Sequence, residues 1–253
     1  MAAAILILAV AYAAGVVAVT RRGRRWPARR SVCWAAGSVA AWLAVTGPLT
    51  DAAHYDFTAH AVAHLLLGMV APLLLVFGAP VTLALRALPV GYARAVSRVL
   101  RSGPVRAVTH PVTAALLNGG GLWILYATGL SHAIHTSPWL EFHLLAAGYL
   151  FAAAIAGPDP APHRPGPAVR GVVLVAFMAS HAVLAKYLYG HPPVGFADGE
   201  AGAQVMYYGG DLVDLVLVVA LCREWYGSVA PGRRVVRRPR APWRLPEEIR
   251  TAR

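Results

Sequence analysis

Long apolar stretches separated by short polar segments run through almost the whole chain. Seven of these stretches have about the 20 residues that a helix needs to cross the hydrocarbon core of a bilayer. They cover approximately residues 2–19, 31–47, 57–79, 111–130, 139–157, 169–189 and 204–222. None alternates apolar and polar residues as a barrel strand does, so helices are the structure that would satisfy the backbone in lipid. The pattern predicts an all-α protein, a polytopic membrane bundle of seven transmembrane helices.

The composition excludes an ordinary soluble domain. Hydrophobic residues make up 58% of the 253 residues and charged residues only 13%, whereas a soluble domain carries about 25% charge. The mean hydropathy is +0.55. Two cysteines, Cys33 and Cys222, are too few for a disulfide framework, so we interpret them as packing residues.

The distribution of basic residues predicts the orientation of the bundle. Lys and Arg total 23 against 11 Asp and Glu, and all of the basic residues except Lys186 fall within four segments. These are residues 20–30, 80–110, 158–170 and the chain from Arg223 onward. Since cytoplasmic loops carry the excess of basic residues, we expect the N-terminus outside and the C-terminus in the cytoplasm.

The basic segments also predict what the cytoplasmic face contacts. Residues 1–225 are expected to form the transmembrane domain, and residues 226–253 a basic tail, rich in Arg and Pro, that is disordered. Within 90–102, arginines recur at helical spacing between apolar residues, which indicates a short amphipathic helix on the inner surface. Anionic lipid, and not nucleic acid, is the partner that such a face predicts.

Ionisable residues inside the membrane are costly and usually functional. The predicted topology brings six of them to the outer half of the membrane, on four helices. They are His60, His64, His143, His181, Asp211 and Asp214. His60 and His64 lie one turn apart on one helix face and could hold one metal ion, and the two aspartates face one way as well. The alternatives are structural: a lone membrane histidine more often hydrogen-bonds a neighbouring helix, and the aspartates could orient the imidazoles or carry protons.

Nearby sulfur and loop residues bear on which metal such a site would take. Imidazole with thioether suits Cu(I), and imidazole with carboxylate suits Cu(II) or Zn. Met178 lies three residues before His181, and Met206 lies near the start of the last span, although membrane methionines are usually packing residues. His132 and His135, in an outer loop, are interpreted either as a surface trap for metal or as ordinary polar loop residues.

Two further features concern the shape of the helices. Pro72 removes one backbone hydrogen bond from the third span, which predicts a kink just below the histidine pair. Gly119, Gly120 and Gly121 in the fourth span favour the close approach of another backbone.

Two runs of residues have a recognisable form. The first extends from Phe57 to Pro80 in the sequence FTAHAVAHLLLGMVAPLLLVFGAP, and the second, AQVMYYGGDLVD, extends from Ala203 to Asp214. Together they resemble the CtaG-type cytochrome c oxidase assembly proteins, which are multi-pass proteins of the bacterial plasma membrane. The resemblance covers most of the chain apart from the basic tail.

The resemblance implies a role in building a haem–copper cytochrome c oxidase by handling or delivering copper, with an oxidase subunit as partner. It nominates the two histidines of the third span first as metal ligands, followed by the other four ionisable residues named above. Family members often carry Met and Gln where this chain has Ala61 and Ala63. This departure argues against a methionine-assisted Cu(I) site on that helix.

Two other functions remain open, a copper or other metal-ion transporter and a bis-histidine membrane cytochrome. Transport lacks a continuous polar path, because Asn118 is the only polar mid-membrane residue in the cytoplasmic half. Haem propionates near the outer surface would need Arg or Lys, for which Lys186 is the sole candidate. An enzyme is not predicted, because no activated nucleophile, Gly-rich phosphate loop or pair of catalytic acids is present.

We expect metal binding to weaken below about pH 6, because imidazole binds metal only in its neutral form. A copper titration of the purified protein between about pH 5 and pH 8 measures this dependence. Binding that stays unchanged across the range would contradict histidine ligation.

Overall fold

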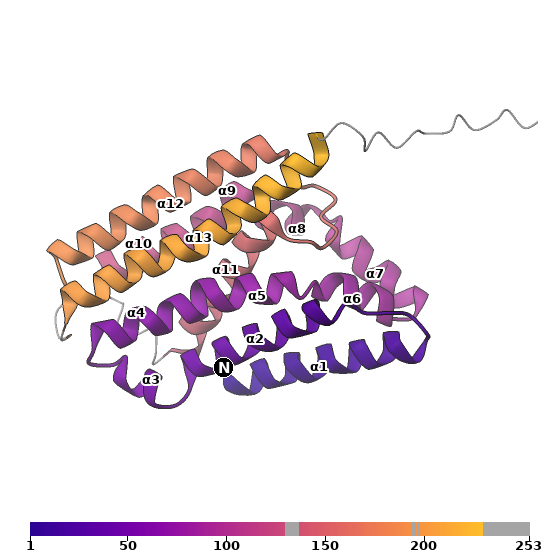
Figure 1. Ribbon diagram of the computed structural model, residues 1–253, viewed down its shortest axis with the longest axis horizontal. Coiled ribbons are helices and arrows are strands. Elements are labelled where there is room, and N and C mark those ends of the chain that lie inside the picture. Colours follow the sequence, from indigo (N-terminus) through magenta and orange to yellow (C-terminus); the bar gives the residue numbers. More distant parts are fainter. Residues whose placement is uncertain (130–136, 194–195, 197, 230–253) are drawn as a thin grey trace, which may run out of the picture.

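The fold was analysed in a computed structural model that describes residues 1–129, 137–193, 196 and 198–229. Within these residues every regular element is a helix, as the apolar pattern predicts (Figure 1). The elements are α1 (Ala2–Arg21), α2 (Ala28–Val45), α3 (Pro48–Ala52), α4 (Phe57–Leu65), η1 (Leu66–Val70), α5 (Ala71–Phe77), α6 (Pro80–Ala87), α7 (Val90–Leu100), α8 (Gly103–Val108), α9 (Pro111–Ala115), η2 (Leu116–Gly120), α10 (Gly121–Ala127), α11 (Pro138–Ala156), α12 (Pro167–Gly190) and α13 (Gly199–Val229). Two of them, η1 and η2, are single turns of π-helix.

Five helical segments are long and apolar enough to cross a membrane. They are Ala2–Arg21, Phe57–Ala87, Pro138–Ala156, Pro167–Gly190 and Gly199–Ser228. The other two predicted spans are also helical, but α2 carries Arg29 and Arg30 in its first turn, and residues 111–127 form a shorter segment. Seven spans therefore remain a prediction, of which the structure supports five.

The segment α4–η1–α5 is the centre of the bundle. Figure 1 shows α12 and α13 side by side along one edge and α1 and α2 along the opposite edge. The central segment contacts α2, α11 and α13. In the apolar part of Phe57–Ala87, 72% of the residues are buried, against 17% in α1. His60 and His64 on this segment are therefore shielded from both lipid and water.

The predicted kink at Pro72 takes the form of a π-helical turn just before the proline. Pro72 has no N–H to donate to the carbonyl of Gly68, and its ring crowds that carbonyl. The chain widens there into η1, as helices do when one backbone bond is displaced. On α11, Gly148 lies directly against the Gly68 carbonyl oxygen, so that a methyl group at residue 148 would overlap it. Glycine at this position allows the two backbones to touch.

The glycines of the fourth span do not admit another backbone, contrary to the prediction. Gly119 faces the ring of Phe177, 3.4 Å from where a Cβ would lie, and Gly121 faces Nε2 of His143 at 2.8 Å. Both nearest neighbours are side chains. The missing Cβ atoms make room for the rings of Phe177 on α12 and His143 on α11.

The Arg-rich segments meet at one end of the bundle through polar contacts. Asp159, in the loop between α11 and α12, accepts hydrogen bonds from the backbone N–H groups of Val81 (3.1 Å) and Thr82 (2.7 Å) and so holds the start of α6. The buried Arg170 of α12 makes a two-pronged ion pair with Glu224 of α13, at 2.8 and 2.9 Å. The face of the membrane on which this end lies stays a prediction.

Two segments near this end also bear on sequence predictions. The expected amphipathic helix at 90–102 is present as α7, and none of its residues is buried. Helix α13 continues to Val229, which is inside the segment expected to be disordered. Residues 230–253, the rest of that segment, lie outside the described residues.

We expect Gly148→Ala to lower the stability of the bundle by about 1–3 kcal/mol or more, because the new methyl group would force α11 away from η1. Gly120→Ala is the matched control, since no heavy atom lies within 4 Å of its Cβ position. Thermal unfolding of both variants in the same detergent measures the difference. Equal melting temperatures would show that the Gly68–Gly148 contact is not a constraint.

Candidate functional site

Helix α4 buries both histidines that its sequence places one turn apart. The helix begins at Asp56, whose carboxylate accepts a 2.9 Å hydrogen bond from the N–H of Ala59. This cap sets the first turn, on which His60 lies, and His64 follows on the next. Their side chains are 0% and 1% exposed. Both histidines therefore lie in the interior of the bundle.

His60 is enclosed by aromatic side chains. Its Nε2 lies 3.1 Å from the hydroxyl of Tyr126 on α10. The rings of Phe57 and Phe196 lie 5.7 and 5.1 Å from the His60 ring, centroid to centroid. One ring nitrogen of His60 is therefore engaged by a phenol within an apolar cage.

His64 pairs with a histidine from a different helix. The rings of His64 and His181 are stacked at 20° with centroids 6.5 Å apart. The ring of Phe177 also lies 6.2 Å from the His181 ring, centroid to centroid, and is itself packed on Phe151. Gly210 of α13 lies against the His181 ring so closely that a Cβ would overlap it. The site is thus built where α4, α12 and α13 converge.

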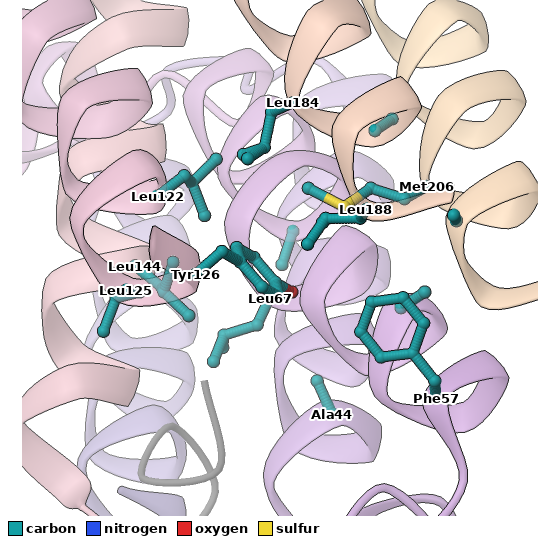
Figure 2. Packing of buried hydrophobic residues seen from close by; sticks show 14 of the residues in the cluster. Ala44, Phe57, Leu67, Leu122, Leu125, Tyr126, Leu144, Leu184, Leu188 and Met206 are labelled. Carbon is teal, nitrogen blue, oxygen red and sulfur yellow. The ribbon is translucent and has the colours of Figure 1, made fainter. Parts of the chain in front are cut away.

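A buried thioether lies in the same core. Met206 of α13 is fully buried and belongs to the apolar cluster that contains Phe57, Leu184 and Leu188. Figure 2 shows Met206 and Tyr126 extending into this core from opposite sides. Met178, the other methionine considered, is only partly buried and packs on a separate cluster.

Asp214 is buried on α13, one helical turn after Gly210. It is 1% exposed, and neither carboxylate oxygen has a hydrogen-bond partner in the described part of the chain. It lines a cavity of about 10 Å³ together with Gly68, Asn118 and Phe177. A cavity of this size holds about one water molecule.

Asp211 and Lys186 do not form the ion pair that their charges suggest. Asp211 is half-buried on the same helix as Asp214. Lys186 is exposed and lies over the ring of Tyr207, 5.4 Å from its centroid. Within the described residues, the one ion pair joins Arg170 and Glu224 at the basic end.

The remaining predicted ligand, His143, lies apart from the others. It is half-buried on α11, with its Nε2 facing Gly121 of α10. Among the described ring contacts, none joins it to the other histidines. No three His, Cys, Asp or Glu side chains gather to hold a metal ion in the described ranges. His132 and His135 lie outside those ranges.

Two aromatic residues of the site were not predicted. The sequence does contain a signal for Tyr126. It is a polar residue near the outer end of the fourth predicted span, at the same predicted depth as the histidines. Phe196 has none, since it lies in a loop whose path the apolar pattern leaves open. A depth assignment that included tyrosines would have added Tyr126 to the candidate residues at this depth.

We expect Asp214→Leu to stabilise the protein by about 1–2 kcal/mol, because it removes an unpartnered buried polar group. Asp159→Leu is the matched control: it deletes three hydrogen bonds to Val81 and Thr82 and should lose about 1–3 kcal/mol. Chemical unfolding in detergent measures both. A destabilised Asp214→Leu variant would indicate that Asp214 serves packing or an internal network.

Comparison with known proteins identifies the family. Residues 10–228 match the cytochrome c oxidase caa3 assembly factor family, Caa3_CtaG. Uncharacterized proteins of Mycobacterium bovis and Mycobacterium tuberculosis are each 31% identical over 88% of this chain, and one of Mycobacterium leprae is 30% identical over 87%. The chain spans 38% of the length of each of these relatives. No solved structure matches. The chain belongs to the cytochrome c oxidase caa3 assembly factor family.

Proposed function

We propose that the chain handles copper during assembly of a haem–copper cytochrome c oxidase, and that the ion is held between His64 and His181. The observation that carries this proposal is a set of buried polar atoms without partners. Nε2 of His181 and both carboxylate oxygens of Asp214 have no hydrogen-bond partner in the described part of the chain. Buried polar atoms are nearly always satisfied, so these atoms favour a ligand that the folded chain receives from outside.

Copper suits the donors that the core offers. Two imidazoles from different helices, with a buried thioether on a third helix, are the ligand types that Cu(I) prefers. His60 is held by Tyr126 and lies one turn from His64, where it could exchange the phenol for the metal. Asp214 and Asp211 would balance the positive charge of the ion. His143, on the far side of η2, would act as an alternative ligand on the route.

An incomplete ligand set is suited to delivery. A site that offers two or three donors binds an ion less firmly than a closed four-ligand site, which leaves a position for the receiving protein. We infer a sequence of capture by histidines of the 130–136 loop, relay to His64 and His181, and transfer to a docked oxidase subunit. No bond of the chain is made or broken, in keeping with an assembly role and not a catalytic one.

The proposed orientation brings this site to the face from which copper arrives. We propose seven spans with the N-terminus outside the bacterial plasma membrane, because α2 and residues 111–127 are helical where the apolar pattern predicts spans. The Arg-rich end would then face the cytoplasm and its anionic lipids. The histidine layer, which comprises His60, His64 and His181, would lie in the outer half of the membrane.

A second candidate, metal or proton transport, is favoured by one observation. The cavity lined by Asp214 and Asn118 is also lined by two neighbours of the histidine pair. Gly68 lies one helical turn after His64, and Phe177 lies one helical turn before His181. This cavity would be a further polar step toward the basic end. Copper accumulation in sealed vesicles containing the protein would separate a transporter from a delivery factor.

We expect the protein, loaded anaerobically with Cu(I), to retain about one copper per chain and His64→Gln/His181→Gln to bind at least tenfold more weakly. The control is His54→Gln/His191→Gln, because these two histidines are not among the proposed ligands. Nδ1 of His54 lies 2.8 Å from the carbonyl oxygen of Thr50, and Nδ1 of His191 lies 3.2 Å from that of Tyr187. Elemental mass spectrometry of the purified proteins gives the metal content. Stoichiometric iron together with a Soret band would indicate a bis-histidine cytochrome instead. Equal copper content in the two variants would show that His64 and His181 are not the copper ligands.

A further inference from the structure

Five arginines from three segments line one groove at the basic end of the bundle. The groove has a volume of about 660 Å³ and is also lined by leucine, valine and alanine side chains. The arginines are Arg22 and Arg24 after α1, Arg86 of α6, Arg94 of α7, and Arg101, which directly follows α7. All five side chains are exposed. Segments far apart in the sequence therefore concentrate positive charge around one hollow.

The charge in this groove is not neutralised by the described chain. No acidic side chain lines it. Arg22 donates from Nη1 to the backbone carbonyl of Arg86 at 3.3 Å, and Arg101 donates from Nε to the carbonyl of Ser97 at 3.2 Å. The guanidinium of Arg86 lies 5.7 Å from the ring of Trp26. These contacts orient the arginines and leave their charge available for an anion.

The same groove is bordered by exposed apolar side chains. Helix α7 has no buried residue, and its Val90, Tyr92 and Val99 are 66%, 68% and 59% exposed. A helix with arginines between exposed apolar residues is suited to the boundary between headgroups and hydrocarbon. Leu85, Leu88 and Val90 line the groove itself. An occupant that is anionic at one end and apolar at the other fits both kinds of lining.

We propose that this groove is a saturable binding site for one anionic phospholipid. The phosphate would be held by Arg94 of α7, by Arg101 at the end of that helix and by arginines of the facing segments, since guanidinium groups bind phosphate through two parallel hydrogen bonds. The acyl chains would lie along Leu85, Leu88 and Val90. A soluble phosphate would leave this apolar lining exposed, which favours the lipid.

A specific lipid-binding site can be distinguished from the general attraction of a basic surface for anionic lipid. Diffuse attraction depends on the number of charges and their distance from the surface, so any two arginines of α7 and α8 would count equally. A site depends on which arginines point into the groove. Arg94 and Arg101 line it, whereas Arg98, on the same helix, and Arg106, on α8, do not. The chain therefore provides a control of equal charge.

The test compares Arg94→Gln/Arg101→Gln with Arg98→Gln/Arg106→Gln in the full-length protein. Each is titrated with phosphatidylglycerol or phosphatidylcholine in a neutral detergent, and bound lipid is counted by native mass spectrometry. We expect the wild type and the Arg98/Arg106 variant to saturate at about one phosphatidylglycerol per chain. The Arg94/Arg101 variant should bind at least tenfold more weakly, with unchanged helical circular dichroism, because all four side chains are exposed.

Three results would overturn the proposal. Equal losses in the two variants would mean that lipid responds only to net charge. Wild-type binding of phosphatidylcholine as tight as that of phosphatidylglycerol would remove the role of the arginines. Complete displacement of the lipid by millimolar inorganic phosphate would assign the groove to a free anion. None of these measurements depends on copper, so the lipid site and the proposed copper function fail independently.

Discussion

The contact between the Gly68 carbonyl and Gly148 is the constraint on which the centre of this bundle depends. Pro72 deprives that carbonyl of its usual helical donor, and η1 widens the helix just before the proline. A side chain at residue 148 would push α11 away from the central segment. Because Gly68 and Gly148 also line the cavity at Asp214, the same contact shapes the surroundings of this buried carboxylate.

A second set of close approaches is made by α13. Gly202 lies against Phe57, Gly209 against Leu65, and Gly210 against His181. Without side chains at these positions, α13 contacts both α4 and α12, which is how small residues bring membrane helices together. The approach at Gly210 confines the His181 ring beside His64. Close approach of bare backbone therefore helps to bring the two rings together.

Buried polar groups occur at both ends of the bundle. At the basic end, Arg170 binds Glu224 of α13 and Asp159 binds the start of α6, although Nε of Arg164 and Nε of Arg170 are buried without a partner in the described chain. In the histidine layer, Nε2 of His181 and the carboxylate of Asp214 are buried without partners in the described chain. Unpartnered buried groups reduce stability. Their presence in the core is the observation on which the proposed copper site rests.

The sequence by itself determined the helices, the separation of the basic end from the histidine layer, and the family. Each follows from local information: apolar length defines a helix, and a spacing of four puts His60 and His64 on one face. The runs around these histidines and Asp214 carried the resemblance that the family match then confirmed.

Only the tertiary structure decided which of the six predicted residues meet. Depth in the membrane can be counted from the sequence, but the direction in which a side chain points around its helix is set by packing against neighbours. Hence His64 meets His181 and His60 meets Tyr126, whereas His143, on a helix that crosses the same layer, faces Gly121. The sequence predicted a kink near Pro72, but neither its form as the π-helical turn η1 nor the second π-helical turn η2.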